Sequence, residues 1–135
     1  MPSNVAKKTA VQGHEWGELN DAFSQTRKGS FTVILAADCL WMPWQHQNLA
    51  KSMLHFLAPI PTARVLVIAG FHTGRAKLAP FFDVAENEGL QVDSIEEVDV
   101  AGNKRPWAKE RDAGKEDVTD RKRWLVVAKL KRRIV

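Results

Sequence analysis

Two continuous apolar runs constrain the fold of this chain more than any other feature. The first is FTVILAA, residues 31–37, and the second is RVLVIAGF, residues 64–71. Neither alternates polar with apolar residues, and both are rich in β-branched side chains. Such runs are typical of strands that are buried on both faces, as in a parallel sheet. The sequence therefore predicts two buried strands that lie parallel to each other.

The segment between these runs, residues 43–57, predicts an amphipathic helix. Its apolar residues recur at helical spacing: Leu49, Met53, Leu54 and Leu57. Pro43 suits the first turn of a helix, and Pro59 and Pro61 help to end one. A strand, a helix and a parallel strand form a βαβ unit, whose crossover is almost always right-handed.

The remaining chain predicts one more helix and two more strands. A helix after residue 74 carries one apolar side: Leu78, Phe81, Phe82 and Ala85. Pro80 fits only near its start, and Gly89 is placed to end it. Residues 91–100 are more polar and predict an edge strand, and residues 101–120 predict a long surface loop. Residues 123–130 predict a last strand, antiparallel to the one before it. We therefore expect an α/β fold whose parallel strands end in an antiparallel strand pair.

The domain organisation that we expect is simple. A length of 135 residues suffices for one domain. Residues 1–10 have no periodicity and predict a loose N-terminus, residues 11–132 form the domain, and residues 133–135 form a tail. Within the domain, the polar stretch before residue 31 predicts a short helix and then a turn at Gly29 and Ser30.

Composition excludes several classes of protein. The single Cys39 excludes an internal disulfide and a multi-cysteine zinc site, and the four histidines have no metal-ligand spacing. We expect Cys39 to behave as a small buried hydrophobic residue. The chain shows neither a signal peptide nor an apolar run long enough to span a membrane, which predicts a cytoplasmic protein. The net charge of +4 arises from 20 basic and 16 acidic residues, a mixture typical of a solvated surface rather than of a nucleic-acid partner.

Two short motifs, together with this strand order, resemble a known family. They are HEWG, residues 14–17, and AADCLW, residues 36–41. Their spacing is similar to that in class I, seven-β-strand S-adenosylmethionine-dependent methyltransferases, in particular lysine methyltransferase family 16 and the fungal nicotinamide N-methyltransferase-like proteins. The resemblance extends from about Val11 to Arg132. It implies the C-terminal half of a Rossmann-like methyltransferase sheet. Trp41 departs from the family, which usually has Tyr or Phe at that place.

The resemblance also implies roles for individual residues. S-adenosylmethionine would be the cofactor, and its edge would lie beside four residues: Trp16, Gly17, Ala36 and Ala37. Asp38 and Trp41 would contact a substrate amine, either a protein lysine or a small amine such as nicotinamide. The alternatives stay open: Asp38 could cap the following helix, Trp16 could be an ordinary core residue, and Trp41 could pack its loop onto the sheet. For Trp44 we expect such packing.

His72 follows the second strand, and it is the one histidine that we expect to face the cleft. A solvated histidine, or one satisfied by hydrogen bonds, is the alternative.

The glycine-rich turn and the ribose-binding acid of the family have no counterpart in this sequence. The chain would then be either an enzyme truncated of its cofactor-binding half or a non-catalytic half-domain, acting as an interaction module or a partial gene product. In both cases the strand at residues 31–37 would expose an apolar edge. We therefore expect self-association or a complementary chain as partner.

Overall fold

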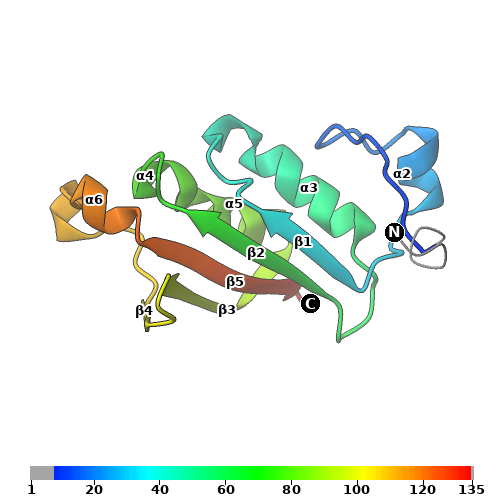
Figure 1. The fold of residues 1–135 in the computed structure, drawn as a ribbon. Coiled ribbons are helices and arrows are strands. Elements are labelled where there is room, and N and C mark those ends of the chain that lie inside the picture. Colours follow the sequence, from blue (N-terminus) through cyan, green and yellow to red (C-terminus); the bar gives the residue numbers. More distant parts are fainter. Residues whose placement is uncertain (1–7, 135) are drawn as a thin grey trace.

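A computed structural model describes residues 8–134 of the chain as one mixed sheet with helices packed on it (Figure 1). The strands are β1 (Val33–Ala37), β2 (Arg64–Gly70), β3 (Leu90–Asp99), β4 (Lys104–Pro106) and β5 (Trp124–Arg132). Their order across the sheet is β1-β2-β5-β3-β4. The helical segments are α2 (Ala22–Thr26), η1 (Pro43–Gln45), α3 (His46–Phe56), α4 (Arg75–Leu78), α5 (Pro80–Glu88), η2 (Asp112–Gly114) and α6 (Val118–Arg121). The predicted loose N-terminus lies mostly outside the described residues.

The βαβ unit at the start of the sheet confirms the sequence prediction. β1 and β2 are parallel, with Val33 opposite Arg64 and Ala37 opposite Ile68. The helix between them begins with a short 3-10 turn that has Pro43 at its first position. The predicted short helix before residue 31 is α2.

The second predicted helix is also present, in two pieces. Pro80 stands at the first position of α5, where its missing N–H costs nothing. α4 precedes it as a single turn. Gly89 ends α5 with a φ of 117°, a left-handed conformation that favours glycine. The predictions that Pro80 lies near the start of a helix and that Gly89 ends it are therefore confirmed.

The sheet is covered on one face only, and the prediction of strands buried on both faces was wrong. Val65, Val67 and Ala69 of β2 are buried against the helices, whereas Ile68 between them is 38% exposed. On β1, Val33 and Leu35 are 60% and 64% exposed. The helical face carries the core, in which α3 and α5 contribute Met53, Phe81 and other apolar side chains. The opposite face has no helix over it among residues 8–134.

The last strand confirms one prediction and corrects another. β5 is antiparallel to β3, as expected. It is also antiparallel to β2, because it inserts between β2 and β3. β3 is therefore an interior strand rather than the predicted edge. The edge on that side is β4, a three-residue strand that pairs Pro106 with Glu96 and Lys104 with Val98.

Residues 101–120 are not a simple surface loop, because a buried charge network holds them on the sheet. Glu97 of β3 is fully buried, and Arg75 at the start of α4 donates to both of its oxygens at 2.6 and 2.9 Å. Arg75 also donates to Glu116 at 2.9 Å. Arg105 and Arg111 donate to Glu97 as well, at 2.9 and 3.2 Å. Burial alone would raise the pKa of Glu97, but hydrogen bonds from Arg75 and Arg111 hold it below its ordinary value.

An aromatic platform lies under the same network. The guanidinium of Arg75 lies 4.1 Å from the ring centre of Phe71, and the Trp107 ring stacks on Phe71 with 6.3 Å between ring centres. Trp107 lies within residues 101–120 and packs against the core, so it anchors this polar stretch. No helix among the described residues is both long and apolar enough to cross a membrane.

Candidate functional site

The carboxyl ends of the two parallel strands bring Asp38 and His72 together. Asp38 directly follows β1, and His72 lies two residues beyond β2. The His72 Nε2 atom is 3.9 Å from the Asp38 Oδ2 atom, and the two side chains are about half exposed. Ligands of open α/β sheets bind at such carboxyl ends. The one histidine that the sequence singled out therefore faces the predicted substrate carboxylate.

The backbone at Asp38 turns the chain sharply out of the sheet. Its φ of 56° is left-handed, a conformation that Asp adopts more readily than most residues. Its N–H still donates to the Ile68 carbonyl oxygen at 2.7 Å, which extends the parallel ladder by one residue. Met42 precedes η1 and Gln45 precedes α3, so Asp38 caps neither helix. The helix-cap interpretation of Asp38 was wrong, and its carboxylate is left available to solvent and ligands.

The two tryptophans after Asp38 are both exposed. Trp44 is 72% exposed, so the prediction that it packs onto the sheet was wrong. Trp41 is 44% exposed, which leaves much of its indole uncovered next to the carboxyl end of β1. An uncovered aromatic face can attract a cationic group.

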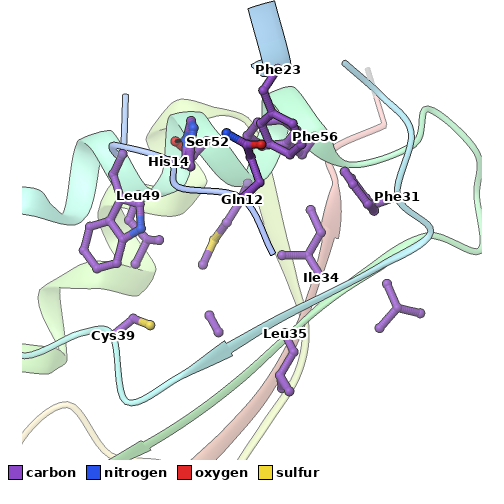
Figure 2. A pocket seen from close by; sticks show the side chains of 14 residues that line it. Gln12, His14, Phe23, Phe31, Ile34, Leu35, Cys39, Leu49, Ser52 and Phe56 are labelled. Atoms are coloured by element: carbon purple, nitrogen blue, oxygen red, sulfur yellow. Dashed lines mark hydrogen bonds between the residues drawn. The ribbon is translucent and has the colours of Figure 1, made fainter. Parts of the chain in front are cut away.

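A groove of about 470 Å³ lies between α3, β1 and the N-terminal segment (Figure 2). It reaches the segment after β1 at Cys39, and Asp38, Trp41 and His72 are not part of its lining. In Figure 2, Leu49, Ser52 and Phe56 of α3 lie across the groove from Ile34 of β1. The lining is mostly apolar, and it comprises Gln12, His14, Trp16, Phe23, Phe31, Val33, Ile34, Leu35, Ala36, Cys39, Leu49, Ser52, Met53 and Phe56.

The structure separates the four residues that the resemblance assigned to the cofactor. Trp16 and Ala36 line the same groove, although they are 20 positions apart in the sequence. Trp16 also packs against the core, which accords with both readings of this residue. Gly17 and Ala37 are not part of the lining. The groove thus unites half of the predicted set.

Gly17 has a structural reason to be glycine. Its φ is 85°, and a Cβ atom there would lie 2.6 Å from the Asn48 Oδ1 atom. Its N–H donates to the Ser52 Oγ atom at 2.9 Å, and the His14 Nε2 atom lies 2.9 Å from the same oxygen. Through these two contacts, Ser52 holds the N-terminal segment against α3. Sequence reasoning missed Ser52, because a single serine within a helix carries no signal of a distant contact.

Cys39 lines the groove next to Asp38 and is only partly buried, contrary to the prediction of a buried residue. Burial and, to a smaller extent, the negative charge of Asp38 raise the pKa of the Cys39 thiol above its ordinary value. The side chain thus stays a neutral thiol at physiological pH, which suits an apolar wall better than a nucleophile.

Comparison with known proteins yields one informative similarity. No family model matches the chain. The chain is 29% identical, over 103 residues, to the protein N-terminal and lysine N-methyltransferase efm7 of Schizosaccharomyces pombe. The chain resembles a methyltransferase. The match covers 69% of this chain and 39% of the yeast protein, so the chain spans about two fifths of the length of that relative.

Proposed function

We propose that this chain is an S-adenosylmethionine-dependent N-methyltransferase-like protein that carries the substrate side of the site. Its substrate would be a protein lysine or a small amine such as nicotinamide. The observation that carries the proposal is the placement of Asp38, His72 and Trp41 at the carboxyl edge of a parallel strand pair. The similarity to the yeast methyltransferase supports it. On this proposal the sheet is the C-terminal half of a Rossmann-like domain.

The exposed side chains have the chemistry that binding of an amine needs. The Asp38 carboxylate would attract and orient an ammonium group, and the face of Trp41 would pack against it. Only a neutral amine is nucleophilic, so the ammonium must first lose a proton. His72 in its neutral form would accept that proton, and Asp38 at 3.9 Å would then stabilise the imidazolium. S-adenosylmethionine, if held beside these residues, would supply the electrophilic methyl group.

The groove fits only one part of that cofactor. Trp16 and Ala36 offer an apolar wall that would hold an adenine ring. Ribose hydroxyls are usually bound by an acidic side chain, and none stands among the lining residues. The lining therefore does not fit the ribose part.

The alternative proposal is a non-catalytic half-domain that acts as an interaction module. The incomplete cofactor lining favours it, since a protein that transfers methyl groups must hold the whole cofactor. The two proposals differ in what the groove should bind.

Calorimetric titration of the whole chain with S-adenosylmethionine, and separately with adenosine, distinguishes them. We expect weak binding of both ligands with similar affinity, because only the adenine ring, which both ligands share, would have apolar side chains to pack against. Trp16→Ala should weaken both by at least about tenfold, the loss of roughly 1.4 kcal/mol. Trp44→Ala, which alters an exposed indole outside the groove lining, is the matched control and should leave binding unchanged.

Two other results would decide against the proposed half-site. If neither ligand binds, the non-catalytic alternative holds. If S-adenosylmethionine binds far more tightly than adenosine, the chain holds the entire cofactor, and the incomplete lining is the wrong account.

A further inference from the structure

β1 is the last strand at one side of the sheet, and half of its backbone groups point outward. Residues of a parallel strand alternate between bonding their neighbour and facing the opposite side. The Asp38 N–H donates to Ile68, and the Thr32 carbonyl accepts from Arg64. The even-numbered residues therefore face β2, and the N–H and C=O groups of Val33, Leu35 and Ala37 face the open side. The Ala37 C=O also accepts from the Cys39 thiol at 3.3 Å, and the next outward residue, Phe31, is paired with Phe56 and Ala58 of the same chain, so the open edge begins at Val33.

The side chains of this edge are apolar on both faces. Val33 and Leu35 are 60% and 64% exposed on the open face, and Ile34 and Ala36 point toward the helices. Native sheets usually protect an edge with a charge, a proline, a bulge or a very short strand. Residues 33–37 have no charged residue and no proline, and their ladder with β2 is regular.

The edge is complementary to itself. We propose that β1 binds β1 of a second copy of this chain, antiparallel, about a two-fold axis at Leu35. In that arrangement Leu35 faces the partner's Leu35, and Val33 faces the partner's Ala37. An antiparallel ladder joins opposite residues by two hydrogen bonds when both point their groups at each other. The three outward residues are placed symmetrically for such pairs.

The exposed side chains of β1 give the second copy more to contact than the backbone alone. A pair of five-residue strands falls short of the roughly 1,200 Å² that a stable interface buries. Ile34 and Ala36 pack within their own chain, so the added apolar contact would come from Val33 and Leu35 on the open face. The inference does not depend on the proposed enzymatic function.

Sedimentation velocity of the whole chain across a dilution series tests the proposal. We expect a dimer that dissociates on dilution. Leu35→Lys should raise the dissociation constant by at least about tenfold, because two like charges would lie directly opposite each other. The side chain is already exposed, so the monomer should stay folded. Val100→Lys, at a position that is 88% exposed and far from β1 in the strand order, is the matched control.

A wild-type chain that stays monomeric at high concentration would overturn the proposal. So would a dimer that persists in Leu35→Lys, or an assembly larger than a dimer, since a two-fold contact closes on itself. If Leu35→Lys fails to fold, hydrogen exchange of the unmodified chain decides. The amides of Val33, Leu35 and Ala37 should be protected at high concentration and exchange rapidly on dilution. Rapid exchange at every concentration would contradict the paired edge.

Discussion

The two edges of this sheet are built in opposite ways. β4 has three residues, Lys104, Arg105 and Pro106, and so combines a short strand with two charges and a proline. β1 has five apolar residues and none of these features. The first edge ends the sheet, whereas the second leaves it able to continue. The described chain therefore protects one edge of its sheet against further pairing and leaves the other edge without such protection.

The largest expected effect is the loss of stability when the Arg75–Glu97 pair, which holds the β4 side of the sheet in place, is removed. Arg75→Leu should destabilise the chain by about 3–5 kcal/mol, because it leaves the Glu97 carboxylate buried without its main partner. Urea unfolding monitored by far-UV circular dichroism measures the change. Lys109→Ala, which removes an exposed ion pair with Asp83, is the control and should cost at most about 1 kcal/mol. Equal effects of the two variants would mean that the buried network does not hold this side.

A smaller effect is expected from acid. The folded chain lowers the pKa of Glu97 below its ordinary value of 4.5, so the unfolded chain binds the proton more readily. The network therefore contributes its full stability above about pH 4.5 and loses it as the pH falls further, toward the pKa of the folded state. Hydrogen exchange at β4 should accelerate in that range. Exchange at β4 that is independent of pH, once corrected for the intrinsic rate, would contradict the role of Glu97.

The sequence predicted the local elements well, because their signals are local. Pro43, Pro80 and Gly89 marked helix ends correctly, and the two apolar runs marked β1 and β2. Burial on both faces was predicted wrongly, since an apolar run looks the same whether its second face is covered by the chain itself or by something else. The alternation at Ile68 in β2 is visible only once the register is known.

The candidate site was predictable in part, and for a related reason. Asp38 and His72 each follow an apolar run, so parallel pairing of the runs was enough to bring them together. Ser52 and the Arg75–Glu97 pair join residues that are 35 and 22 positions apart. Nothing in a serine within a helix, or in charges within a polar stretch, indicates which distant residue it will meet.

Pairing through the β1 edge can be tested most directly by introducing a proline into β1, since β4 has a proline at the protected edge of the sheet. Leu35 points its N–H outward, so Leu35→Pro removes only a donor that the monomer does not use. Ala36→Pro is the contrasting variant, because the Ala36 N–H faces β2, and we expect it to disrupt the fold. Light scattering on eluted Leu35→Pro should give the molar mass of a folded monomer where the wild type gives a dimer. A folded Leu35→Pro chain that still dimerises, or a wild type without dimer, would contradict the account.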